Sequence, residues 1–338
     1  MLSSLFPVVM IALMMFDEPC AIAVDFGGTS IKMGVTCGER ILKEAERIPT
    51  PNFSSPEAMI AEMIKTARAL KSEFPSACVI GLGLPGWCDY QKRVVYQLTN
   101  VDVWNEVVPI REMMEEALQL PVILDNDGNC MAYAEWKMGA GKNLQSIVCM
   151  TMGTGLGGGM IINDRMVRGK RVSAAELGMT SIDYRGRKGP FGNKGAIEEY
   201  IGNNELAADA VARYAEAGIV KNVSECNPRA LEDAARAGCP IAGLIWDDCA
   251  AKLACLMMNL MYTFVPEAFI IGGGVAKAGE LLFEPLRRHL DEQLFFLHQE
   301  ELLILPAYFG TESGLIGAGA MALDELQGKG ELKFFKKS

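Results

Sequence analysis

The sequence predicts an α/β fold, in which strands and helices alternate along the whole chain. Short apolar runs rich in β-formers alternate with longer segments whose apolar residues recur at helical spacing. One pattern, a strand, a glycine-rich turn and a second strand, occurs once in each half of the chain. With 338 residues, half of them hydrophobic, the chain is long enough for two domains of ordinary size.

The expected elements follow from these patterns in chain order. Strands are expected at residues 21–27, 31–37, 77–83, 121–126, 146–153, 158–163, 267–273 and 302–307. Helices are expected at 55–74, 109–120, 127–140, 205–218, 241–265, 278–297 and 312–326. The last of these, ESGLIGAGAMALDEL, consists largely of small residues and is suited to close packing.

Charge and cysteine usage narrow the class of protein. The net charge is −10 with no run of lysine or arginine, which gives no footprint for nucleic acid or an anionic membrane. The ten cysteines occur singly, several within apolar runs, which is typical of reduced core residues and favours the cytoplasm. The apolar segment at 241–265 contains Asp247, Asp248 and Lys252, so we expect a buried helix and no membrane span.

The N-terminal run MLSSLFPVVMIALMMF resembles a signal sequence, and Ala21-Ile22-Ala23 imitates its cleavage pattern. No basic residue precedes the run, and cleavage after Ala23 would remove most of the strand that leads to Asp25. We therefore expect residues 1–18 to be a frayed extension or to reflect a misassigned start, with Met14 or Met15 as the initiator.

Three glycine clusters are candidate phosphate-binding turns. Residues 21–35 and 147–162 each form the strand–turn–strand pattern, in which glycine lets backbone N–H groups approach an anion closely. The alternative is a pair of ordinary hairpins. The third cluster, Gly272-Gly273-Gly274, follows a strand and precedes a helix, where free N–H groups are available to a nucleotide. This order is typical of an actin-type ATPase, with nucleotide between two duplicated domains.

The acid–base group of any enzyme here is expected to be a carboxylate. The two histidines, His289 and His298, lie in or beside a charged helix, which gives a histidine-dependent triad little support. An apolar strand ends in Asp125-Asn126-Asp127, at the strand end where α/β proteins bind ligands. Asp127 is either a functional carboxylate or a helix cap worth about 1 kcal/mol, and the segment alone leaves both open.

These residues resemble the ROK family of bacterial sugar kinases and related repressors over about residues 20–325. The resemblance lies in co-linear segments: DFGGTSIKMGV, GLGLPGWCD, LDNDGNCMAYAEW, MTMGTGLGGGMI, AAELGM, GNKGAIEEY, IIGGG and SGLIGAGA. It implies a two-domain actin-like fold of the hexokinase type, with duplicated ribonuclease H-like domains, a nucleotide cleft between them and usually a homodimer. The expected domains are 19–125, completed by a helix at about 311–328, and 126–310.

The resemblance also implies transfer of the ATP γ-phosphate to a sugar hydroxyl with Mg²⁺, and a role for each matching residue. Asp127 would be the general base, and Asn126, Gly86 and Asn100 would shape the sugar pocket. Asp25 would act through Mg²⁺ and its waters. The residues implied to bind ATP and its phosphates are Gly27, Gly28, Thr29, Lys32, Gly153, Thr154, Gly155, Gly272, Gly273 and Gly274.

The loop at 176–198, ELGMTSIDYRGRKGPFGNKGAIE, departs from the family pattern. Most ROK sugar kinases hold a structural zinc here with one histidine and three cysteines, and these positions are Met179, Gly189, Phe191 and Ala196 in this chain. With no cysteine or histidine in the loop, a tetrahedral zinc site cannot form, and we expect an apolar cluster with Ile197 instead. By resemblance, Glu176 and Glu198 accept hydrogen bonds from sugar hydroxyls; alternatively they are solvated loop residues.

The sequence therefore predicts an ATP-dependent, glucokinase-like kinase of a hexose or N-acetylhexosamine. One alternative is a sugar-sensing regulator, although fewer than 25 residues precede the first glycine turn, too few for the usual winged helix-turn-helix. A second is a sugar-binding sensor with weak or no activity. Polyphosphate as donor is a further alternative, which the acidic composition does not favour.

Overall fold

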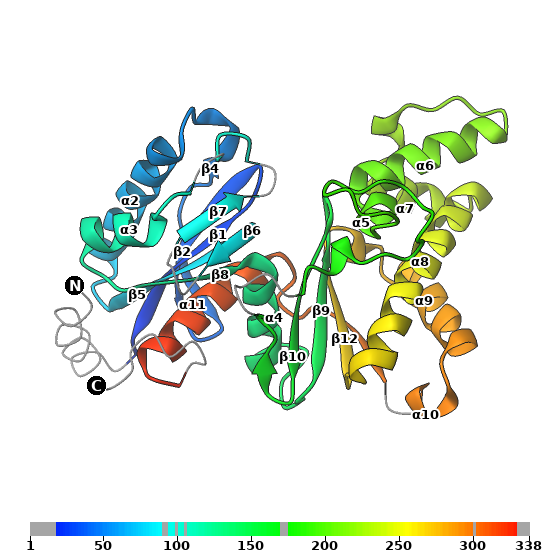
Figure 1. Cartoon of the computed structure of the whole chain (residues 1–338). Helices are drawn as coiled ribbons and strands as arrows, with labels where there is room; N and C mark the ends of the chain where they lie inside the picture. The colour runs from blue at the N-terminus through cyan, green and yellow to red at the C-terminus, as the bar shows by residue number, and fades with distance from the viewer. Residues whose placement is uncertain are drawn as a thin grey trace. The chain divides into compact units, whose positions relative to one another are not determined.

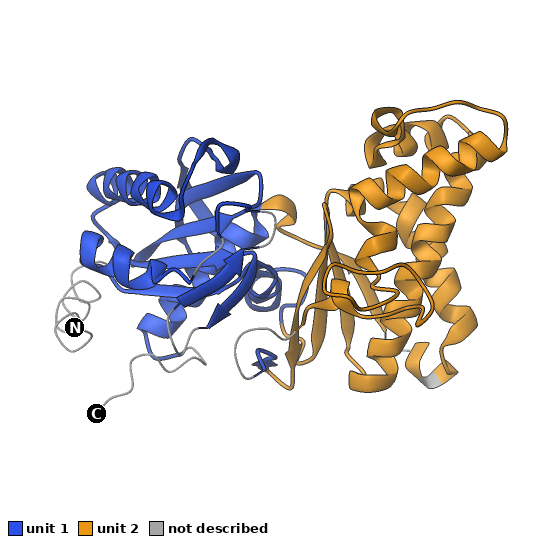
Figure 2. Ribbon diagram, turned by 45° about the horizontal axis from the view of Figure 1, so that its top comes forward, with its two compact units in different colours: residues 1–142, 165–174, 312–338 blue, residues 143–164, 175–311 orange. Residues whose placement is uncertain are grey.

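The computed structural model describes residues 18–89, 94–98, 101–104, 107–169, 175–299 and 302–329. Two compact units emerge (Figure 2). The first comprises Met1–Lys142, Arg165–Ala174 and Glu312–Ser338, and the second comprises Asn143–Asp164 and Ala175–Thr311. The functional domain boundaries expected from the sequence stay predictions.

The first unit contains a mixed sheet with the strand order β3-β2-β1-β5-β8, and β4 pairs with β2 (Figure 1). β1 is antiparallel to β2 and parallel to β5, which is parallel to β8. Its strands are β1 (Cys20–Phe26), β2 (Ser30–Cys37), β3 (Arg40–Glu44), β4 (Ile48–Pro49), β5 (Ala77–Leu84) and β8 (Val122–Asn126). The four strands expected in this part of the chain are confirmed, within a residue or two at their ends.

Helices cover both faces of this sheet because the side chains of each strand alternate in direction. Ile22 and Val24 of β1 join a core with α2 (Pro56–Glu73) and α3 (Ile110–Leu118), whereas Ala21 packs with α11 (Ser313–Leu326) on the opposite face. α11 also packs against α4 (Asp127–Lys137), and a Cβ at Gly317 would collide with the Cys130 carbonyl. The expected close packing of the small-residue helix is therefore confirmed.

The second unit contains a similar mixed sheet, in which β10, β9, β12 and β13 are neighbours in this order. β9 and β10 are antiparallel, and β12 is parallel to both β9 and β13. These strands are β9 (Ile147–Met152), β10 (Leu156–Ile162), β12 (Ala268–Gly273) and β13 (Leu303–Pro306). The β9–β10 hairpin repeats the β1–β2 hairpin, so the internal repeat read from the sequence is present in the fold.

The helices of the second unit match the expectation apart from one break and two additions, of which the single turn α5 is one. They are α5 (Glu198–Ile201), α6 (Asn203–Glu216), α7 (Pro228–Arg236), α8 (Pro240–Phe264), α9 (Glu280–Gln293) and α10 (Phe296–Gln299). The single helix expected at 278–297 is divided, because Leu294 adopts an extended conformation and is buried. α7 has no counterpart among the expected helices.

The remaining elements are short. They are β6 (Gly86–Asp89), β7 (Val94–Leu98), β11 (Arg165–Met166) and the 3₁₀ turns η1 (Thr50–Asn52), η2 (Leu177–Met179), η3 (Val223–Cys226), η4 (Val275–Ala278) and η5 (Gly310–Glu312). α8 is buried along much of its length, as expected.

Within the described part of the chain, no helix is long and apolar enough to cross a membrane. All ten cysteines are free, and each is buried or half-buried.

Candidate functional site

The first glycine turn joins β1 to β2 and is closed by its own backbone. The N–H of Gly27 donates to the Ser30 carbonyl at 3.0 Å. One residue before the end of β1, the carboxylate of Asp25 is paired with the ammonium group of Lys32 at 2.9 Å across the hairpin. The turn therefore presents backbone groups beside one fixed carboxylate and one cation, a combination suited to a phosphate and its metal ion.

At the carboxyl end of β8, the start of α4 is capped by Asn126. Its side-chain oxygen accepts hydrogen bonds from the N–H groups of Gly128 (2.9 Å) and Asn129 (3.3 Å). Asp127 is instead the first helical residue, and one of its oxygens accepts from the N–H of Gly128 at 2.9 Å. The cap, which the sequence alone left open for Asp127, thus falls to its neighbour.

The buried side chain of Asp125 holds this segment through hydrogen bonds and an ion pair. It is 1% exposed, and its Oδ1 accepts from the Asn126 N–H and the Asn129 amide, both at 2.7 Å. Its Oδ2 accepts from Nε of Arg168, itself 6% exposed, at 2.7 Å. Arg168 is not predictable as a partner of Asp125, because nothing in the local sequence distinguishes it from the neighbouring basic residues.

Gly86, also predicted to shape the sugar pocket, lies beside Asn126. The Asn126 amide donates weakly to the Gly86 carbonyl at 3.4 Å, so these two residues lie together. Gly86 has a φ of +95°, a conformation that favours glycine. Asn100 lies outside the described residues.

The second glycine turn, Gly153-Thr154-Gly155, contacts one of the two loop glutamates directly. The carboxylate of Glu198 accepts from the N–H of Leu156 at 2.9 Å, immediately after the turn. A Cβ at position 155 would collide with that carboxylate, so glycine is required for this approach. The turn itself is closed by a bond from the Gly153 N–H to the Gly155 carbonyl at 2.9 Å.

The carboxylates of Glu176 and Glu198 are half-buried, and acidic neighbours raise the pKa of each: Glu198 acts on Glu176, and Glu199 and Glu205 act on Glu198. Burial raises the pKa of Glu176, and the nearby charge of Glu198 raises it further. Burial also raises the pKa of Glu198, and the Leu156 N–H opposes that rise. Both carboxylates are thus partly removed from water, which is unfavourable for a charged group without a compensating partner, and their assignment to sugar binding stays a prediction.

The third cluster ends β12 at a tight backbone contact. Gly273 has a φ of +86°, and a Cβ there would collide with Met152 of β9. The element that follows Gly274 is the single 3₁₀ turn η4, and α9 begins only at Glu280. Where a helix was expected directly after the glycines, the structure therefore has only a short 3₁₀ turn.

The apolar cluster expected inside the loop is wrong in part. Ala196 and Ile197 are fully buried, but Phe191 is 59% exposed. A side chain on Gly189 would lie 3.2 Å from the Cβ of Ala196 and even closer to the amide of Asn193. The Asn193 amide in turn donates to the Met179 carbonyl at 2.9 Å. Hydrogen bonds of the backbone and of the Asn193 amide therefore hold the part of the loop where apolar packing was expected.

We expect a transition-metal chelator such as 1,10-phenanthroline to leave the thermal unfolding midpoint of the protein unchanged. Residues 176–198 contain no thiol or imidazole, and the loop is closed by bonds such as Ile197 N–H to the Thr180 carbonyl (3.0 Å). Differential scanning fluorimetry with and without chelator measures this. A clear fall in the midpoint that added Zn²⁺ reverses would contradict it.

Comparison with known proteins identifies the family. The sequence model of the ROK family matches residues 21–325 of this chain. The chain belongs to the ROK family. A glucokinase from Streptomyces coelicolor is 32% identical to it over 313 residues, which cover 89% of this chain and 96% of that protein. A xylose repressor from Caldicellulosiruptor bescii is 27% identical, covering 73% of this chain and 63% of the repressor.

A solved ROK structure shows the same fold. The crystal structure of a ROK family glucokinase from Streptomyces griseus, in complex with glucose and AMPPNP, superposes with a TM-score of 0.76 at 31% identity. The match covers 90% of this chain and 99% of the glucokinase. The α/β fold with two mixed sheets is therefore the actin-like fold of ROK proteins, and the chain is a glucokinase-like, ATP-dependent sugar kinase of this family.

Proposed function

We propose that this ROK kinase transfers the γ-phosphate of Mg-ATP to a hydroxyl of a hexose or N-acetylhexosamine, with Asp127 as the general base. The observation that supports this assignment is that other residues cap α4 and form the buried ion pair at its start. Asn126 caps the helix and Asp125 is bonded by Arg168, so neither structural task falls to the carboxylate of Asp127 alone. A carboxylate at a strand end is well suited to accept a proton from a bound hydroxyl.

The proposed reaction is an in-line displacement. The acceptor oxygen forms a bond to the γ-phosphorus while its proton passes to a carboxylate oxygen of Asp127. The bond from that phosphorus to the β–γ bridging oxygen breaks, and ADP leaves. Positioning and charge neutralisation account for most of the acceleration in such transfers.

We assign the glycine turns to the nucleotide. Gly27, Gly28 and Thr29 would bind phosphate with Lys32, and Asp25 would orient Mg²⁺ through its waters, since a carboxylate is an oxygen donor that Mg²⁺ prefers. When bound, Mg²⁺ supplies charge neutralisation for the β- and γ-phosphates. The corresponding residues on the second unit are Gly153, Thr154, Gly155, Gly272, Gly273 and Gly274. The implied homodimer and cytoplasmic location stay predictions.

Glu176 and Glu198 are proposed to accept hydrogen bonds from sugar hydroxyls. Their half-burial supports this, as does the charge of Glu198 near Glu176, because a polyol donates several hydrogen bonds to paired acceptors. The experiment that tests the proposal is a coupled ADP-release assay with Mg-ATP against a panel of hexoses and N-acetylhexosamines, repeated with polyphosphate as donor. Sugar-dependent release with ATP supports it, and release that no sugar stimulates contradicts it.

Sugar affinity is expected to weaken as the pH falls from neutral toward the ordinary glutamate pKa of about 4.3. The pKa values of Glu176 and Glu198 are both raised, so protonation begins at a higher pH than for ordinary glutamates and removes hydrogen-bond acceptors. The same two groups act oppositely on stability. Because their folded-state pKa values exceed the unfolded ones, they bind protons preferentially in the folded state and favour it as the pH falls.

Equilibrium sugar binding without nucleotide measures this pH effect apart from titration of Asp127 during turnover. The control is Glu176→Gln, which removes one of the two titrating groups and should flatten the pH dependence. A wild-type dissociation constant that does not change across the range would contradict the assignment of these carboxylates to sugar binding.

A further inference from the structure

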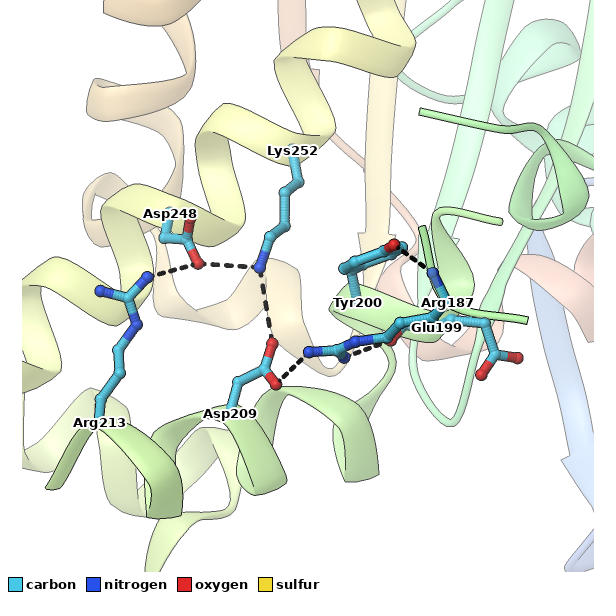
Figure 3. A network of polar contacts seen from close by, with 7 residues as sticks. All are labelled: Arg187, Glu199, Tyr200, Asp209, Arg213, Asp248 and Lys252. Atoms are coloured by element: carbon cyan, nitrogen blue, oxygen red, sulfur yellow. Dashed lines mark hydrogen bonds and ion pairs between the residues drawn. The ribbon is translucent and has the colours of Figure 1, made fainter. Parts of the chain in front are cut away.

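The loop between Glu176 and Glu198 is bound near its middle by one side chain, Arg187. Its Nη1 donates to the Glu199 carbonyl at 2.6 Å, and its Nη2 pairs with the Asp209 carboxylate at 2.5 Å (Figure 3). Its guanidinium carbon lies 4.6 Å from the centroid of the Tyr200 ring, and its backbone N–H donates to the Tyr200 hydroxyl at 2.8 Å. Arg187 thus holds two residues that directly follow Glu198.

Behind Arg187, charges of alternating sign connect the loop to two long helices. Asp209 of α6 pairs with Lys252 of α8 at 3.6 Å, and Lys252 pairs with Asp248 at 2.8 Å. Asp248 in turn pairs with Arg213 of α6 at 2.9 Å. Lys252 also lies 5.6 Å from the centroid of the Tyr200 ring, so two cations, Arg187 and Lys252, lie near this ring (Figure 3). We call these five charged residues with Tyr200 the Arg187 network.

The Arg187 network is more important for fixing the direction of the loop than for the stability of the fold. Arg187 is 43% exposed and Asp209 is 23% exposed, and partly exposed ion pairs add little stability each. A planar guanidinium, however, fixes direction, because its two N–H groups bind two acceptors while its face stacks on an aromatic ring. Lysine at this position would keep the charge and lose that geometry.

The helix that carries Glu198 needs such an anchor. α5 (Glu198–Ile201) is a single turn, too short to be stable as a helix by itself. The carboxylate at its first residue is bonded to Leu156, and Ile201 at its end is buried. Between them, Arg187 connects Glu199 and Tyr200 of the turn to α6. α6, with 14 residues, provides the fixed point through Asp209.

We propose that Arg187 is a positioning residue that sets the place and direction of Glu198 for sugar binding. The proposal rests on the function proposed above. Arg187 acts through α5 and contacts no substrate itself. Its loss should displace an acceptor of the sugar hydroxyls and leave the Mg-ATP turns unaffected.

The test compares Arg187→Lys with Arg213→Lys, the same substitution at the other end of the same network, where the arginine pairs with Asp248 and not with the loop. Arg187→Lys should lower kcat/KM for the sugar by about 10- to 100-fold, mainly through KM, because small displacements of a positioned group have effects of this size. KM for ATP should remain unchanged. Arg213→Lys should change neither value, and both variants should have similar unfolding midpoints.

Amide hydrogen exchange provides a readout that does not depend on activity. The N–H groups of Tyr200, Ile201 and Gly202, which close α5, should exchange faster in Arg187→Lys than in Arg213→Lys. Equal exchange and equal sugar KM values in the two variants would overturn the proposal. Faster exchange in a protein that lacks sugar-dependent turnover would support the anchoring role and locate the failure in the proposed function.

Discussion

Replacement of Asp127 with asparagine is expected to lower sugar-dependent turnover by about 10²- to 10⁴-fold, the usual contribution of a positioned base. Asparagine has nearly the same shape and cannot take the hydroxyl proton. The fold should persist, because the helix cap is Asn126 and the buried ion pair involves Asp125. KM for the sugar should change much less than kcat, since the substitution removes proton transfer and leaves most binding contacts in place.

The matched control is Asp233→Asn on α7, an exposed aspartate whose side chain is 61% exposed. It should turn over at the wild-type rate. Steady-state ADP release and the thermal midpoint of both variants complete the comparison. Asp127→Asn with near-normal turnover would remove Asp127 from the base role, whatever its effect on stability.

Replacement of Arg168 with methionine is expected to destabilise the protein by about 3–5 kcal/mol, because it leaves the Asp125 carboxylate buried without its partner. Asp125 is 1% exposed, so water cannot replace the lost N–H donor. Denaturant unfolding measures the change. Adding Asp125→Asn to Arg168→Met should recover part of the stability, because the uncompensated charge is then removed.

The comparison variant is Arg40→Met, which breaks the pair between Arg40 and Glu18 on the surface. These side chains are 60% and 68% exposed, so the loss of unfolding free energy should be small compared with that of Arg168→Met. If Arg168→Met were no more destabilising than Arg40→Met, the buried pair would not stabilise the segment that carries Asp127.

Local patterns in the sequence predict much of this fold. The strands around Asp25 and Asp125 are short apolar runs that end in polar residues or glycine, and each is a strand in the structure. The helix at 55–74 begins with a serine cap and a proline, and the structure has both at the start of α2. In such segments the information lies within a few residues.

The contacts that organise the candidate site are of another kind. Arg168 meets Asp125 across 43 positions of sequence, and Arg187 meets Asp209 across 22. No local pattern indicates such partners. Phe191 illustrates the opposite error: a large apolar residue was expected to be buried, yet it is 59% exposed, and hydrogen bonds close the loop around it.

Phosphorus NMR of one sample containing the protein, Mg-ATP and the best acceptor of the sugar panel separates a kinase from a sugar-binding sensor. We predict that a sugar phosphate monoester and ADP appear together in equal amounts, and that neither forms at that rate with Asp127→Asn. Hydrolysis of ATP to inorganic phosphate, or unchanged ATP in a protein that binds sugar, would contradict the proposed phosphoryl transfer and favour the sensor.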